Sequence, residues 1–158
     1  MSCGVALAVS LIFSDPTLVA SIAVPPAADA TPVSVAAEPL FADIVGRSAT
    51  LKTMVDGWIA GGASDRAEFW TAPTFVAFKG MATDLAELNM QGHVVLKDRG
   101  TDGDLKCILR GISEDMPKKV AAVETATSPA ERRVALDELS YLLNDNVEVI
   151  TSPPQPEV

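Results

Sequence analysis

Residues 39–60 read PLFADIVGRSATLKTMVDGWIA and carry a clear amphipathic pattern. Apolar side chains return every three or four positions, as they do along one face of an α-helix. The next two residues, Gly61 and Gly62, supply the left-handed backbone that commonly ends a helix. We therefore predict a helix over 39–60 whose buried stripe consists of Leu40, Phe41, Ile44, Val45, Leu51, Met54, Val55, Trp58 and Ile59.

A second segment with helical periodicity follows a Gly- and Pro-containing connection. Asp65 with Glu68 resembles a capping pair that would open a short turn, and Thr71 is the expected N-cap of the next helix. This helix is predicted from about Ala72 to Met90, with Gly92 ending it and a further turn over 93–97. Its inward side chains are expected to be Phe75, Phe78, Met81, Leu85 and Leu88, with Val76 beside them.

A third helix is expected after the polar loop 98–104, with Asp102 or Asp104 as its cap. Pro117 should bend or split this helix, because a proline ring collides with the preceding turn. The apolar positions nevertheless continue on both sides of the proline, at Leu105, Ile108, Leu109, Ile112, Met116, Val120 and Val123.

The fourth helix has the strongest local start signal in the chain. Ser128 can accept hydrogen bonds from first-turn amides, Pro129 suits the first helical position, and Glu131 can reach back to Ser128. The helix is predicted to continue to about Val149. Its expected buried side consists of Val134, Leu139, Leu142, Leu143, Val147 and Ile150.

Four such segments joined by short loops predict an all-α fold, an antiparallel four-helix bundle over 39–150 with a proline-bent third helix. Composition agrees, because hydrophobic residues make up 48% of the chain and aromatic residues only 5%. A core built mainly from aliphatic side chains suits helix packing better than a β-sandwich.

Residues 1–30 are predicted to be a cleavable signal peptide. An apolar run over 4–13 has the length of a signal core, and small-x-small patterns follow at 21–23 and 28–30. Asp15 and Pro16 interrupt the apolar stretch, so it is too short for an ordinary membrane span. A basic start is missing, which leaves open an upstream start of translation or an uncleaved leader. Residues 31–38 are expected to be a flexible tether and 151–158 a disordered tail. The predicted location is periplasmic or secreted.

The net charge of the chain is −9. Removal of residues 1–30 would take away Asp15 and Asp29 and no basic residue, which leaves −7. A negative body repels phosphate backbones, and the basic residues are scattered rather than clustered. We therefore expect no nucleic-acid partner, and no stable membrane span once the signal is removed.

The loop 98–104 reads DRGTDGD and is the most acidic local cluster. Its oxygen atoms could serve calcium, with Asp98, Thr101, Asp102 and Asp104 as candidate ligands. The pattern departs from a calcium-binding loop of the EF-hand type, because Gly100 and Leu109 stand where ligands are required. Helix capping is therefore the favoured role, and the four residues are only weak metal candidates.

Cys107 and His93 are the remaining chemically distinctive side chains of the predicted mature domain. His93 is the only histidine, so a multi-histidine zinc site is excluded, and a surface role is favoured. Cys107 flanks the apolar stripe of the third helix and is expected to be buried as a small hydrophobe. The alternative is a reactive or dimer-forming thiol, since Lys106 and the helix N-terminus would favour the thiolate.

No motif for haem, a di-iron centre, phosphate or nucleotide binding, or nucleophilic catalysis is present, and we predict no cofactor and no catalytic residues. No family resemblance is carried by the residues; the likeness to periplasmic helical bundles is one of architecture, which does not determine activity. The leading hypothesis is an exported, non-enzymatic protein that binds a protein or a small ligand in the cell envelope. The alternatives are an unrecognised enzyme with carboxylates between helices, and a structural or stress protein.

Overall fold

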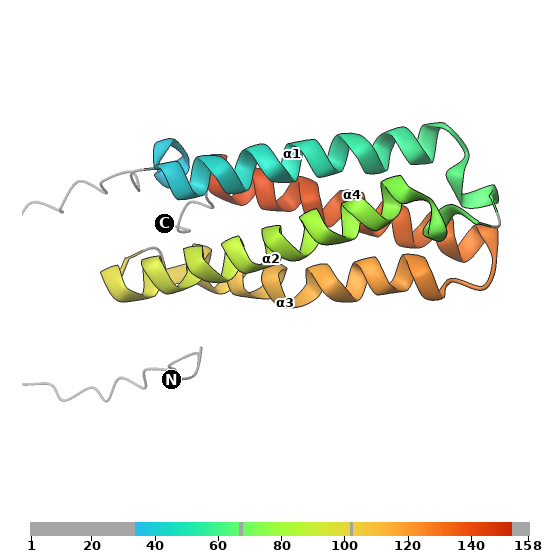
Figure 1. Cartoon of the computed structure of the whole chain (residues 1–158). Coiled ribbons are helices and arrows are strands. Elements are labelled where there is room, and N and C mark those ends of the chain that lie inside the picture. The colour runs from blue at the N-terminus through green and yellow to red at the C-terminus, as the bar shows by residue number, and fades with distance from the viewer. Residues whose placement is uncertain (1–33, 67, 102, 153–158) are drawn as a thin grey trace, which may run out of the picture. The chain divides into compact units, whose positions relative to one another are not determined.

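The computed structural model describes residues 34–66, 68–101 and 103–152, and these form four long helices without a strand (Figure 1). Consecutive helices run in opposite directions, so the molecule is an antiparallel four-helix bundle, as the periodicity predicts. The signal peptide expected over 1–30 lies outside the described residues, as does most of the expected tail. The helices are α1 (Pro39–Ala60), α2 (Pro73–Arg99), α3 (Gly103–Thr125) and α4 (Pro129–Thr151).

The helices pack as two close pairs, α2 with α3 and α1 with α4, which meet mainly through α3 and α4. The buried positions along each helix alternate in steps of three and four, the spacing at which left-handed bundles interdigitate. The largest fully buried side chains are Phe41, Phe75, Phe78, Ile44, Leu51, Leu85, Leu96, Leu109, Met116, Leu136, Leu139 and Leu143.

The second helix is longer than predicted, because Gly92 does not end it. Gly92 is buried inside α2, where an added Cβ would meet Leu109 Cδ1 at 3.0 Å and Phe41 Cε1 at 3.3 Å. The glycine therefore allows close approach of helices rather than a stop. The helix ends instead at Gly100, whose φ of +69° is the left-handed conformation that favours glycine.

The third helix is continuous across Pro117. The alternative that the proline splits the helix is therefore wrong. Pro117 is exposed, so its ring displaces no core side chain, and the buried positions continue on both sides of it at Met116 and Val120.

Val134, predicted on the buried side of its helix, and Val76, predicted beside the buried side chains, are both on the surface. Val76 is 58% exposed and Val134 is 56% exposed, whereas Leu136 is fully buried. Both valines lie between the three- and four-residue steps of the buried row, so their hydrophobicity does not place them in the core.

The C-terminal part of the expected tether 31–38 is instead packed on the bundle. Val35–Ala37 form a 3₁₀ turn, η1, in which Val35 is buried. The guanidinium of Arg99 then binds both carboxylate oxygens of Glu38 at 2.7 and 2.8 Å, which joins the start of α1 to the end of α2. The rest of the tether lies outside the described residues. At the other terminus, Thr151 belongs to α4 and is not part of a tail.

Candidate binding site at the link between α1 and α2

The link 61–72 between α1 and α2 is the longest irregular connection of the described bundle. It contains two 3₁₀ turns, η2 (Ala63–Asp65) and η3 (Phe69–Thr71), and η2 is preceded by Gly62 with φ +64°. Asp65 does not begin the next turn as expected, because it is the last residue of η2 and its amide donates to the Gly62 carbonyl, while Glu68 is the N-cap of η3. The hydroxyl of Thr71 donates to the Glu68 carbonyl, so Thr71 does not cap α2; Ala72 occupies that position.

The link is anchored by an aromatic cluster at this end of the bundle. The ring of Phe69 lies 5.1 Å from that of Trp58, edge to face, and 5.2 Å from that of Phe75. Phe78 extends the cluster, with its ring 5.0 Å from Trp58. Burial of these large rings, together with edge-to-face contacts, stabilises an otherwise irregular segment.

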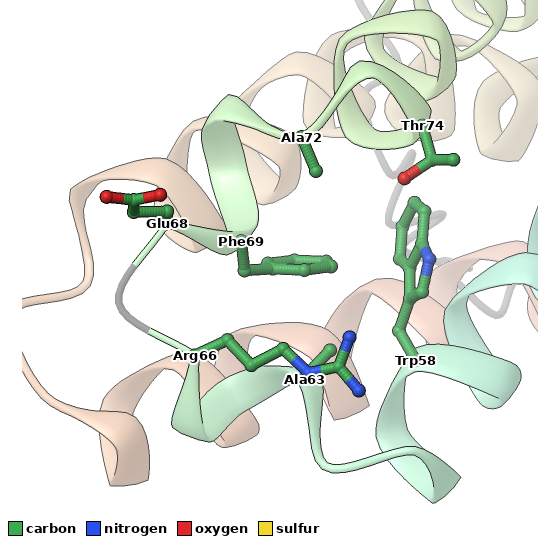
Figure 2. A pocket seen from close by; sticks show the side chains of 7 residues that line it. All are labelled: Trp58, Ala63, Arg66, Glu68, Phe69, Ala72 and Thr74. Carbon is green, nitrogen blue, oxygen red and sulfur yellow. The ribbon is translucent and has the colours of Figure 1, made fainter.

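A pocket of about 490 Å³ opens beside this cluster and is lined by Trp58, Ala63, Arg66, Glu68, Phe69, Ala72 and Thr74 (Figure 2). The rings of Trp58 and Phe69 form its apolar walls. The Arg66 side chain extends along one side, and its guanidinium donates to the Gly61 carbonyl at 3.3 Å. The carboxylate of Glu68 points away from the Phe69 ring. The pocket thus combines aromatic walls with one cationic and one anionic side chain, Arg66 and Glu68, at its edge.

Arg132 of α4 holds the link from its other side. It is only 4% exposed, and its Nη1 donates to the Ser64 carbonyl at 2.5 Å. Its guanidinium carbon lies 4.2 Å from the centre of the Trp70 ring, and Nη2 reaches the Ala126 carbonyl at 3.4 Å. Sequence reasoning missed this residue, although it lies seven positions before Leu139 and so belongs to the buried row of α4.

Three further polar side chains occupy the core. Asn146 of α4 donates to the hydroxyl of Ser48 in α1 at 2.9 Å, and Ser48 donates to the Ile44 carbonyl at 2.8 Å. Asn89 of α2 donates to the Leu85 carbonyl within its own helix. All three are fully buried. They follow the spacing of the core, so only that spacing, and not hydrophobicity, could have indicated them.

The loop proposed for calcium is mostly helical. Asp98 lies in the last turn of α2 and Asp104 in the first turn of α3, with Thr101 exposed between them. Asp102 lies outside the described residues. Within the described ranges no three His, Cys, Asp or Glu side chains come together as metal ligands would. The calcium hypothesis therefore gains no support from the arrangement.

Cys107 on α3 is half-buried. It is neither fully buried, as a core residue would be, nor fully exposed, as a freely reactive thiol would be. The nearby His93 lies with Nδ1 2.7 Å from the Lys106 carbonyl. Because a carbonyl only accepts hydrogen bonds, Nδ1 carries the proton in this contact. His93 thus connects α2 to α3 beside Cys107, and whether the thiol is reactive remains a prediction.

Several carboxylates of α4 are paired at the surface. Asp137 pairs with Arg133 on the same helix, and Glu138 pairs with Lys119 of α3. Asn144 donates to Glu148 at 2.7 Å. Glu131 and Glu138 both line a hollow between α3 and α4, and the enzyme alternative stays a prediction.

A hydrogen-bonded group of three side chains, Ser140, Asp56 and Lys52, joins α1 to α4. The hydroxyl of Ser140 donates to Asp56 at 2.6 Å, and Lys52 donates to the other oxygen of Asp56 at 2.6 Å. The Lys52 hydrogen bond, with help from Ser140, lowers the pKa of Asp56. A carboxylate with a lowered pKa is a weaker base, so the arrangement favours a helix tie over activation of Ser140.

Comparisons with known proteins identify no relative from which the function of this site could be inferred. No protein-family model matches the chain, and neither curated proteins nor solved structures show significant similarity to it. In the described ranges, none of the helices has the length and hydrophobicity needed to cross a membrane.

Proposed function

We propose that this protein is a non-enzymatic binding protein whose pocket at the α1–α2 link takes a small apolar ligand carrying an anionic group. The observation that carries the proposal is a cavity of about 490 Å³ with Trp58 and Phe69 as walls and Arg66 along one side. Pockets for small ligands commonly measure about 300–1,000 Å³ and combine apolar walls with a few polar groups.

The aromatic walls define the apolar part of the ligand. Phe69 is buried against Trp58 and Phe75, so its ring is held in place before any ligand arrives. A fixed aromatic surface loses little conformational freedom on binding. A flat or chain-like apolar group would therefore be bound by contact with these rings.

Arg66 defines the polar part. Within the described residues it forms no ion pair, and its one hydrogen bond, to the Gly61 carbonyl, occupies one of five N–H donors. A carboxylate, sulfonate or phosphate could accept two of the remaining donors in parallel. The acidic chain, at −9, repels anions in general, so recognition would depend on this local cation.

We further propose that binding takes place outside the cytoplasm, in the periplasm or after secretion. The support is the apolar run at 4–13 followed by small-x-small cleavage patterns. N-terminal mass spectrometry of the protein from its own cells should find a chain that begins near Thr31. A chain that retains residues 1–30 in all fractions would contradict export.

Binding is tested with two fluorescent probes of the same aromatic body, 1-anilinonaphthalene-8-sulfonate and the uncharged N-phenyl-1-naphthylamine. The variant Ala72→Phe fills the pocket from a position with extended backbone and should abolish saturable binding of both probes. Arg66→Gln should weaken the sulfonate probe about five- to tenfold, as expected for loss of a charge-assisted bond, and leave the neutral probe unchanged.

The control for this experiment is Val134→Ala. Val134 lines a separate hollow of about 540 Å³ between α3 and α4, which also has mainly apolar walls. The variant should leave both affinities unchanged. Loss of binding in Val134→Ala, with Ala72→Phe unaffected, would move the site to α3 and α4 and overturn the proposal. Absence of saturable binding to the unmodified protein would also overturn it.

A further inference from the structure

We infer that Arg132 is the positioning residue of the pocket: its buried guanidinium clamps the two 3₁₀ turns that carry the pocket wall, and ligand affinity depends on that clamp. The inference rests on the proposed function, because it concerns the same pocket. Arg132 does not line the cavity itself and would act through the link.

In each of the two 3₁₀ turns of the link, one residue lines the pocket and the next contacts Arg132. Ala63 in η2 lines the pocket, while the next residue, Ser64, gives its carbonyl to Arg132. Phe69 in η3 lines the pocket, while the next residue, Trp70, stacks on the Arg132 guanidinium. The Arg132 side chain therefore contacts both turns on the side away from the pocket. A shift of either turn would move a residue of the pocket wall.

A role in holding the link would explain why an arginine occupies this core position. Arg132 continues the buried row of Leu139 and Leu143, where an aliphatic side chain would avoid the cost of burying a charge. Within the described residues no carboxylate pairs with it, and Nε has no hydrogen-bond partner. The contacts it does make are with the link and with the Ala126 carbonyl.

The geometry also requires a guanidinium rather than any cation. Its central carbon lies over the Trp70 ring, 4.2 Å from the ring centre, while an N–H group donates to the Ser64 carbonyl. A planar group with several fixed donors can stack and donate at once, whereas the ammonium of lysine is a compact point charge. Arg132→Lys should therefore restore the clamp only in part.

The test compares Arg132→Met and Arg132→Lys with the control Leu139→Ala, which removes a core side chain seven positions along the same buried row. Each full-length variant is measured at a temperature at which circular dichroism shows it folded. Affinity for 1-anilinonaphthalene-8-sulfonate should fall at least tenfold in Arg132→Met and by less in Arg132→Lys. In Leu139→Ala, stability should fall and affinity should be unchanged.

Amide hydrogen exchange supplies a readout that is independent of any ligand. Exchange over 63–72 should accelerate at least tenfold in Arg132→Met relative to the helix centres, and uniformly across the bundle in Leu139→Ala. Unchanged affinity together with unchanged exchange over 63–72 in Arg132→Met would overturn the inference. If the unmodified protein binds neither probe, the proposed function fails, and the exchange measurement still decides whether Arg132 clamps the link.

Discussion

The α1–α2 and α3–α4 connections lie at the same end of the bundle (Figure 1) but are stabilised in different ways. The α3–α4 connection is short and held by its own residues. Ser128 Oγ accepts from the Glu131 amide at 3.2 Å, and Glu131 accepts from the Thr127 amide at 2.8 Å. The α1–α2 link is long and is held by Arg132, 68 residues away from its partner Ser64.

The difference shows how each connection is held in place. The α3–α4 connection satisfies backbone groups with its own side chains, and the hollow of about 540 Å³ beside it is lined in part by Ala126 and Glu131. A connection that depends on distant side chains has backbone and rings arranged by packing, and a pocket lies beside it. The comparison predicts that damage to the α1–α2 link costs more stability than damage to the α3–α4 connection.

The largest effect is expected for Phe69→Ala. This change removes a buried ring that contacts Trp58 and Phe75, so the free energy of unfolding should fall by about 3 kcal/mol. Chemical denaturation followed by circular dichroism measures it. Tyr141→Ala, which removes a ring that is 73% exposed on α4, is the control and should change stability by less than about 0.5 kcal/mol. A cost below about 1 kcal/mol in Phe69→Ala would mean that the link is not anchored by its own aromatic ring.

A smaller effect is expected for Ser128→Ala in the other connection. The variant loses the hydroxyl that caps α4, and the free energy of unfolding should fall by about 1 kcal/mol. Ser152→Ala, at the opposite end of α4, is the matched control, since within the described residues Ser152 contributes its backbone amide and not its hydroxyl to the end of the helix. Equal losses in Ser128→Ala and Phe69→Ala would remove the distinction between the two connections.

The smallest effect concerns pH. Hydrogen bonds from the Thr127 side chain and amide, and from Ser128, lower the pKa of Glu131. An acid whose pKa is lower in the folded state stabilises the fold above its unfolded pKa of about 4.3, and the contribution disappears as pH falls through the folded value. Glu131→Gln should therefore lower Tm at pH 7, and the difference from the unmodified protein should shrink by pH 3. A Tm difference that is constant from pH 7 to pH 3 would contradict this role.

The sequence predicted those elements whose signals are local. Pro39 and Gly61-Gly62 bound α1 where expected, and Ser128 with Glu131 forms the predicted capping box. Two of the errors concern residues whose role depends on how the helices pack. Gly92 has the composition of a helix stop and acts as a contact point for Leu109, while Val134 has the hydrophobicity of a core residue and lies outside the buried row.

Most of the candidate site could not be predicted from the sequence, because its residues come together only when the helices pack. Trp58 and Phe69 could be identified as apolar residues, but not as two walls of one pocket. Arg132 reads as a charged residue in the first turn of a helix, and only the spacing from Leu139 hints at its burial. The acids of the loop 98–104 are close in sequence, but closeness in sequence alone does not assemble a metal site.

The amino-acid sequence by itself determined that this chain forms four amphipathic helices, where two of them begin, and which apolar residues can supply the core. These properties follow from the 3.6-residue period and from hydrogen bonds within a single turn, which involve neighbours only. Tertiary structure alone decided that Gly92 lies between helices, that Arg132 meets Ser64 and Trp70, and that a pocket opens beside Phe69. Such contacts depend on how separate helices are rotated and spaced, and no local period of the sequence specifies that arrangement.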